Sequence, residues 1–176
     1  MLLKESAPVE ESRKNKDLNS LDLRPVLLLN NANAKETSAL DEDSLAALLR
    51  IAFYARGIER GATAFLIALD HNAPYENPNF AWFKASRQPF VYIDRVVVAE
   101  SKRGQGIAKL LYLDLFAAAM DAGHTRVVCE VNIDPPNPAS DAFHAAMGFF
   151  AVGQATIHDG AKTVRYFEKA LRWSLR

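Results

Sequence analysis

The spacing of apolar residues along the chain predicts five strands separated by helices and loops. Short apolar runs, some with the two-residue alternation of a strand, occupy residues 24–31, 62–69, 90–98, 126–132 and 162–169. A polar and aromatic stretch from Asp70 to about Pro89 predicts a long loop between the second and third strands. Helical segments alternate with these strands, so the pattern predicts a mixed α/β protein.

Apolar residues three or four positions apart predict helices. Asp41 is a good N-cap for the first of them, and Leu40 and Leu45 on either side of it form a hydrophobic staple. Its apolar stripe consists of Leu45, Leu48, Leu49, Ala52 and Phe53. Gly57 and Gly61 are expected to end this helix. A second helix, from Gln105 to Ala122, is apolar on more than one side, which predicts that it is buried against the sheet and another element.

Between the third strand and the second helix lies a glycine turn that suits a phosphate. Gly104 and Gly106 allow backbone conformations closed to other residues, so N–H groups can converge on one point ahead of the positive end of the helix. Three cations, Lys102, Arg103 and Lys109, lie nearby. A P-loop is excluded because no Lys-Ser/Thr pair opens the helix, and a dinucleotide fingerprint is disfavoured because Lys109 stands where its third glycine would be.

The form of this turn, Arg-x-x-Gly-x-Ala at Arg103, Gly106 and Ala108, resembles the acyl-CoA pyrophosphate loop of the GNAT superfamily of N-acetyltransferases. The alternative is a simple strand-to-helix turn. A second unit resembles the same superfamily: Asn137 as N-cap, Pro138 in the first helical position, a short helix, and Gly148 before an extended segment. The residues that match this unit are Asn137, Ser140, Phe143, Gly148 and Phe149. Together the matches span residues 91 to 170.

This resemblance implies a central, mostly antiparallel mixed sheet flanked by helices, with two central strands that splay apart around the acyl donor. It implies acetyl-CoA as co-substrate. No cluster of metal-ligating residues is visible in the sequence, so no metal is expected. The residues that it places along acetyl-CoA are Val96, Val97, Val98, Arg103, Gly104, Gln105, Gly106, Ile107, Ala108, Lys109, Asn132, Asn137, Ser140 and Phe143.

Acidic residues in two of the strands are candidates for a general base. An amine is mostly protonated near neutral pH, so a carboxylate must remove a proton before nitrogen attacks the thioester. Asp94 and Glu130 are both flanked by apolar strand residues, and both are predicted to be catalytic. Alternation places Tyr92, Asp94, Val96 and Val98 on one face. Arg95 then points to the opposite face, so a direct Asp94–Arg95 salt bridge is not expected, and each could equally be neutralised by another residue.

The residue expected to protonate the departing thiolate differs from the one that is common in the superfamily. The superfamily often has a tyrosine one residue after the position of Phe143, and this chain has His144. An imidazolium titrates near ~6.5 and a thiol near ~8.5, so His144 could donate the proton. The alternatives are a histidine that is only packed on the helix, and hydroxyl donors at Tyr92, Tyr112 or Tyr166.

The acceptor-binding residues are predicted in the long loop and near the first strand. The loop segment at residues 75–83 is rich in aromatic and polar groups, which suits a lid or a wall of the acceptor site. The residues chosen are Asn31, Phe80, Trp82 and Tyr92. The same loop residues could instead form a hydrophobic cluster that packs the loop.

Length, charge and cysteine content narrow the remaining choices. The 176 residues favour one domain, predicted at residues 21–176 after a polar and mobile extension at residues 1–20. The 21 basic and 21 acidic residues cancel, which argues against nucleic-acid binding. No apolar run suits a membrane span or a signal peptide, so a cytoplasmic location without membrane partners is expected. The lone Cys129 is expected to be buried and inert.

The sequence therefore predicts an N-acetyltransferase that transfers an acetyl group directly from acetyl-CoA to a primary amine. The expected acceptor is a small molecule, either a metabolite or an amino acid, with a peptide amine also open, and a homodimer would follow the habit of the superfamily. A noncatalytic acyl-CoA-binding or sensor module is the main alternative, because the tyrosine-to-histidine change would permit loss of catalysis. A nicotinamide-dependent oxidoreductase is a third alternative.

Overall fold

The computed structural model describes residues 16–20 and 22–172, and its core is a seven-stranded sheet. In spatial order the strands are β1 (Lys16–Asp17), β2 (Tyr54–Ile58), β3 (Ala64–Asp70), β4 (Val91–Val98), β5 (Arg126–Asp134), β7 (Lys162–Ala170) and β6 (Phe150–Ile157). The β4–β5 pair is parallel, and the other pairs within the described residues are antiparallel. This confirms the mixed, mostly antiparallel sheet expected from the sequence.

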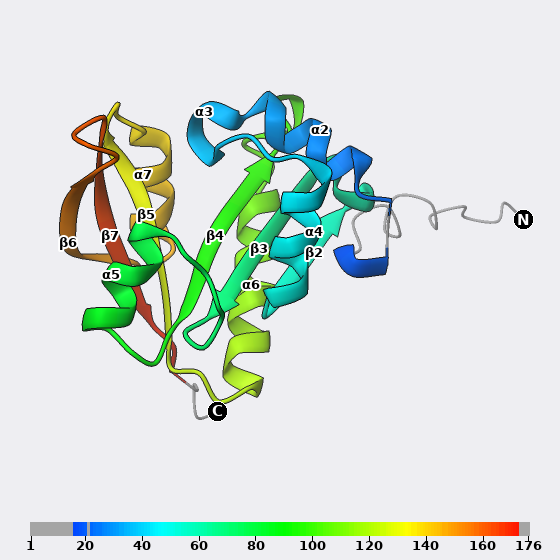
Figure 1. The fold of residues 1–176 in the computed structure, drawn as a ribbon. Helices are drawn as coiled ribbons and strands as arrows, with labels where there is room; N and C mark the ends of the chain where they lie inside the picture. The colour runs from blue at the N-terminus through cyan, green and yellow to red at the C-terminus, as the bar shows by residue number, and fades with distance from the viewer. Residues whose placement is uncertain (1–15, 21, 173–176) are drawn as a thin grey trace, which may run out of the picture.

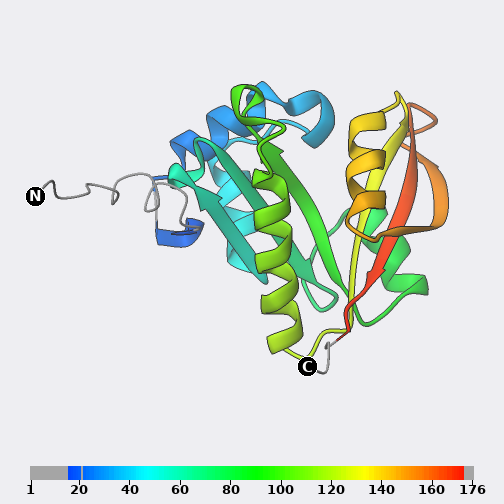
Figure 2. The ribbon, with the colours of Figure 1, turned by 180° about the vertical axis from the view of Figure 1, so that it is seen from behind.

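Helices cover both faces of this sheet (Figures 1 and 2). One face packs against α2 (Arg24–Ala32), α4 (Glu42–Ile51) and α5 (Pro78–Ser86), and the other packs against α6 (Ile107–Asp121) and α7 (Pro138–Ala146). A short helix, α3 (Ala34–Thr37), follows α2, and single 3-10 turns lie at Leu18–Ser20, Glu59–Gly61 and Glu100–Lys102. Among the described residues no helix has the length and apolar character needed to cross a membrane.

Several elements differ from the sequence prediction. Residues 24–31, expected as a strand, form helix α2, because Pro25 occupies its first turn and the buried pair Val26 and Asn30 is spaced by four residues. The expected loop after Asp70 contains α5, which Asn77 caps by accepting hydrogen bonds from two backbone N–H groups. Helix α4 ends at Ile51, before the glycines that were expected to end it. Residues 54–58 form strand β2 instead, which the sequence pattern does not predict.

The sequence predicts a mobile extension at residues 1–20, and residues 1–15 of this segment lie outside the described residues. Its described part packs on the domain, since β1 pairs with β2 and Leu18 is fully buried.

A bulge in β4 reverses the expected alternation of its side chains. Ile67 of β3 lies opposite Arg95 and Ala68 opposite Ile93, so Asp94 is an extra residue in β4. Before the bulge Tyr92 packs on the α2, α4 and α5 side, whereas beyond it Val96 and Val98 pack on the α6 side. Tyr92 and these two valines therefore do not share a face. Asp94 and Arg95 instead point to the same side.

The two central strands separate soon after they meet. Within the described residues β4 and β5 pair at Val91–Val127 and Tyr92–Val128 and at no later position. Both ribbon views show the strands diverging from this point (Figures 1 and 2). The divergence leaves the β5-facing edge of β4 from Ile93 to Val98 without a strand partner in this part of the chain, and it opens the space in which the candidate site lies.

Candidate active site

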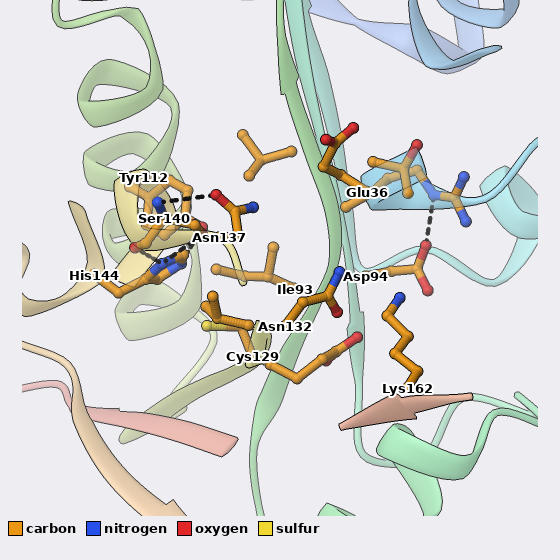
Figure 3. A pocket seen from close by; sticks show the side chains of 15 residues that line it. Glu36, Ile93, Asp94, Tyr112, Cys129, Asn132, Asn137, Ser140, His144 and Lys162 are labelled. Carbon is orange, nitrogen blue, oxygen red and sulfur yellow. Dashed lines mark hydrogen bonds and ion pairs between the residues drawn. The ribbon is translucent and has the colours of Figure 1, made fainter. Parts of the chain in front are cut away.

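Three cavities adjoin one another at the divergence of β4 and β5, and Glu36 and Thr37 of α3 line all of them. The central cavity lies between the strands, and Figure 3 shows Tyr112, Ser140 and His144 on one side of it and Glu36, Asp94 and Lys162 on the other. The loop-side cavity extends from there toward Arg103, and the outer cavity extends toward the β6–β7 turn. The three cavities together connect the glycine turn to the opposite face of the sheet.

The glycine turn has the backbone that the sequence predicted. Gly104 has φ 74° and Gly106 has φ 77°, and a Cβ at either position would meet no atom within 4 Å. Glycine is therefore needed for conformation rather than for space. Gly106 is the N-cap of α6, whose first turn has no acidic side chain, so the positive end of this helix is open to an anion.

Most of the residues predicted along acetyl-CoA line the loop-side cavity or the turn before it. Val96, Val97, Val98, Arg103, Ala108, Asn137, Ser140 and Phe143 line the loop-side cavity, and Asn132 lines the central one. Gly104, Gln105, Gly106, Ile107 and Lys109 form the turn and the first turn of α6. Arg103 donates to the Val98 carbonyl at 3.2 Å and to Asn33 Oδ1 at 2.7 Å, which holds the turn against the α2–α3 junction.

Helix α7 begins and ends as predicted. Asn137 Oδ1 accepts from the Ser140 N–H at 3.3 Å, Pro138 occupies the first turn, and Gly148 follows the helix with φ 82°. This capping aims the first turn of α7 at the cavities, and it places His144 one turn further along, 4% exposed.

The surroundings of His144 fix its tautomer. Its Nδ1 lies 2.7 Å from the Ser140 carbonyl oxygen, which can only accept, so Nδ1 carries the hydrogen of the neutral ring. Nε2 then accepts from the Tyr112 hydroxyl at 2.8 Å. Burial lowers the pKa of His144 and raises that of Tyr112 well above its usual value. Neutral His144 therefore has no proton to offer at Nε2, and Tyr112 occupies that nitrogen.

The two carboxylate oxygens of Glu130 differ in their surroundings, since one accepts hydrogen bonds and the other is buried without a hydrogen-bond partner among the described residues. Oε1 accepts from Asn79 Nδ2 and from the Tyr92 hydroxyl, each at 3.0 Å. Oε2 is buried and has no hydrogen-bond partner among the described residues. Desolvation, followed by the charge of Asp94, raises the pKa of Glu130 from 4.5 to about 7. The residue lines both the central and the outer cavity.

Asp94, the second predicted base, is already occupied. Its Oδ2 accepts from Arg95 Nε at 2.7 Å and its Oδ1 accepts from the Tyr75 hydroxyl at 2.5 Å. The salt bridge between adjacent residues was not expected from the sequence, and it forms because the β4 bulge turns both side chains the same way. Asp94 therefore acts on the site through its charge, which raises the pKa of Glu130.

The residues predicted for acceptor binding lie mostly outside the cavities. Tyr92 lines the outer cavity, but Phe80 is 1% exposed in the core, and Trp82 stacks on Tyr166 with ring centroids 4.1 Å apart. Asn31 exchanges hydrogen bonds with the Leu40 backbone. The aromatic residues of α5 thus form the hydrophobic cluster that the sequence left open as the alternative.

Other lining residues were not singled out by the sequence analysis. They include Glu36 and Thr37 on α3, Asn77 and Asn79 at the start of α5, and Lys162 at the start of β7. The Asn-Pro pair at Asn77–Pro78 repeats the helix-start signal of α7 and could have revealed α5.

Neither metal ligation nor a nucleophilic thiol is evident in the described part of the chain. No group of three or more His, Cys, Asp or Glu side chains there is placed to hold a metal ion. Cys129 is buried, and burial raises the pKa of its thiol well above the usual value, so the reactive thiolate is disfavoured.

Comparison with known proteins gives a match of part of the chain to one family model and a shared fold. Residues 68–149 match the family model described as Acetyltransferase (GNAT) family. No curated protein matches the chain.

Solved structures with the same fold cover almost all of the chain. The ribosomal-protein-S18-alanine N-acetyltransferase from Escherichia coli is 14% identical, with a TM-score of 0.65 over 92% of this chain and 95% of its own. Ard1 from Thermoplasma volcanium is 12% identical, with a TM-score of 0.67 over 91% and 98% of the two chains. A chain of the NatC complex bound to Gag peptide and CoA is 16% identical, with a TM-score of 0.65 over 90% and 98%.

Proposed function

We propose that the chain is an acetyltransferase of the GNAT family, whose model matches residues 68–149, and that it transfers the acetyl group of acetyl-CoA directly to a primary amine with Glu130 as general base. The observation that carries this proposal is the free, buried Oε2 of Glu130 beside the cavities. A carboxylate with a pKa of about 7 is half ionised near neutral pH, where it can take a proton from an ammonium group directly or through water.

The donor would enter along the loop-side cavity. Its pyrophosphate would meet the turn at Gly104 and Gly106 and the positive end of α6, while its arm would run between β4 and α7. This placement brings the thioester to the central cavity, within the divergence of the strands. The CoA in the NatC complex, which has the same fold, supports this donor.

The unpaired edge of β4 would stabilise the transition state. Attack by nitrogen places negative charge on the thioester oxygen, and backbone N–H groups that do not pair with β5 are free to donate to it. Residues Val96, Val97 and Val98 line the loop-side cavity and supply this edge. Collapse of the intermediate forms the amide C–N bond and breaks the C–S bond, with CoA leaving as thiolate.

Proton delivery to sulfur would pass through Tyr112. His144 is neutral at rest, so the relay would operate from the minor form in which Nε2 is protonated: its N–H would then donate to the Tyr112 oxygen while the phenol donates to sulfur in the central cavity. A phenol alone is a weaker acid than a thiol, whereas an imidazolium is a stronger one. The pair His144–Tyr112 therefore takes the part that the sequence assigned to His144 alone.

The test is thiol release from acetyl-CoA in a screen of primary amines. The wild-type protein should release CoA with at least one amine, and kcat/KM should rise with pH through about 7 as Glu130 loses its proton. Glu130→Gln should lower kcat about a hundredfold or more and remove this rise. Glu76→Gln, which changes an exposed carboxyl group, is the control.

Two results would contradict the proposal. Acetyl-CoA binding without thiol release for any amine would favour the noncatalytic acyl-CoA-binding module. Full activity of Glu130→Gln would exclude Glu130 as the base.

A further inference from the structure

Two cationic side chains, Arg95 and Lys162, border the outer cavity beside Glu130, and part of their hydrogen-bonding capacity is unused. Arg95 is 8% exposed and donates from Nε to Asp94 and from Nη1 to Asn30 Oδ1 at 2.9 Å. Its third nitrogen, Nη2, has no hydrogen-bond partner in the described ranges. The ammonium group of Lys162 likewise has no ion pair or hydrogen bond within them, although its backbone belongs to the β6–β7 ladder. Both side chains line the central and the outer cavity.

The position of Lys162 directs its charge toward the reacting end of the site. On β7 it shares a face with Val164 and Tyr166, and Tyr166 lies opposite Glu130 of β5. Figure 3 shows its side chain extending from β7 toward Asp94, away from Tyr112 and His144. Its charge is felt at Glu130, where it favours the ionised carboxylate. The ammonium group therefore lies on the amine side of the cavity and not along the donor.

The remaining lining of the outer cavity is polar and mostly uncharged. Thr37, Ser38, Asn77 and Asn79 contribute hydroxyl and amide groups. The carboxylate of Asp94 is engaged by Arg95 and Tyr75, and Glu36 is an exposed residue at the rim, where water screens its charge. The cavity thus presents a base for an amine together with the Lys162 ammonium group and a free N–H-bearing nitrogen of the Asp94-paired Arg95, both of which can donate hydrogen bonds to an anion.

We propose that the acceptor is a primary amine that also carries a carboxylate, as an α-amino acid does, and that Lys162 and Nη2 of Arg95 bind this carboxylate. The assignment rests on the proposed function. The ammonium group gives a proton to Glu130, its nitrogen forms the amide bond with the acetyl carbon, and the C–S bond of acetyl-CoA breaks to leave CoA. The carboxylate is unchanged in the reaction and serves to orient the amine. An amine without an anion would leave the Lys162 charge unpaired next to its own charge.

The experiment compares acceptors that differ only in the carboxylate. Proteinogenic amino acids, their carboxamides and the amines obtained by removing the carboxylate are assayed with wild-type protein, Lys162→Met and Lys35→Met. Lys35 is an exposed residue on α3 that lines none of the three cavities, so its replacement is matched in charge. The wild-type kcat/KM should be about tenfold or more higher for at least one amino acid than for its carboxamide. Lys162→Met should remove this preference, mainly through KM, whereas Lys35→Met should keep it.

Other outcomes would overturn the assignment. Equal use of the amino acid and its carboxamide, or an equal loss for both in Lys162→Met, would show that no carboxylate is recognised. A preference for diamines would show that the pocket binds a second ammonium group, with Glu36 as its partner, and not a carboxylate.

A binding measurement separates this inference from the proposed function. Deaminated acids, such as propionate for the alanine series, are titrated calorimetrically into the CoA-bound protein. Binding that depends on Lys162, without acetylation of any amine, would support the carboxylate site and contradict the transferase proposal. Acetylation of amines regardless of a carboxylate, with no binding of the acids, would support the transferase and overturn the carboxylate site.

Discussion

Replacing Glu130 by glutamine should stabilise the protein at alkaline pH while it abolishes the base. Glutamine has the shape of glutamate, and its Oε1 can still accept from Asn79 and Tyr92, as the carboxylate does now. The variant loses only the ionisable group whose charge is buried and unpartnered at Oε2. Its effect on the free energy of unfolding therefore measures the cost of that buried charge.

The magnitude follows from the pKa. A carboxyl group with a pKa of 4.5 in the unfolded chain and about 7 in the folded protein binds a proton more tightly when folded. Its contribution to stability is thus fully present below 4.5 and is lost as the pH rises through about 7. At about 1.4 kcal/mol per pH unit, this corresponds to about 3 kcal/mol between pH 4.5 and pH 8.

Urea unfolding of wild type and Glu130→Gln at pH 4.5 and pH 8 measures this difference in the free energy of unfolding. The free energy of unfolding of Glu130→Gln, relative to wild type, should increase by about 3 kcal/mol from the lower to the higher pH. Glu76→Gln, at an exposed carboxyl group, should show no such change. An increase smaller than about 1 kcal/mol would mean that Glu130 titrates as an ordinary carboxyl group, and the argument for it as a base at neutral pH would fail.

Two further substitutions test the donor side. Gly106→Ala forces a side chain into a left-handed conformation at the turn and should weaken acetyl-CoA binding measured by calorimetry. The control is Gly123→Ala, at a glycine with φ 83° at the far end of α6. It should lose a similar free energy of unfolding, about 1 kcal/mol, and keep full affinity for acetyl-CoA. Tyr112→Phe should lower kcat about tenfold or more and leave the KM for acetyl-CoA near the wild-type value, because only the proton path to sulfur is cut. Tyr54→Phe, which removes another buried hydroxyl near α6, is its control, and an equal loss of kcat in both variants would exclude the relay.

The features that the sequence predicted well depend on local signals. A left-handed backbone at Gly106 and the Asn137 cap of α7 each involve a few neighbouring residues, so the residue types alone are informative. The Asn77–Pro78 pair is the same kind of signal and indicates the start of α5. The polar composition around it favours a loop, which is what the sequence analysis predicts there. At residues 24–31 the sequence pattern predicts a strand where the structure has helix α2, because a short apolar run does not distinguish a strand from a helix segment.

The chemistry of the site depends on contacts between distant segments. The sequence alone determined the glycine turn, the capped helix α7 and the presence of carboxylates in the central strands. Only the tertiary structure decided which carboxylate is free, because the β4 bulge turns Asp94 toward Arg95 while Asn79 and Tyr92 hold one oxygen of Glu130. Burial then shifts the pKa of Glu130, and β7 brings Lys162 to the same cavity. Periodicity cannot foresee a bulge or the solvation of a carboxylate, since both arise from the packing of elements far apart in the chain.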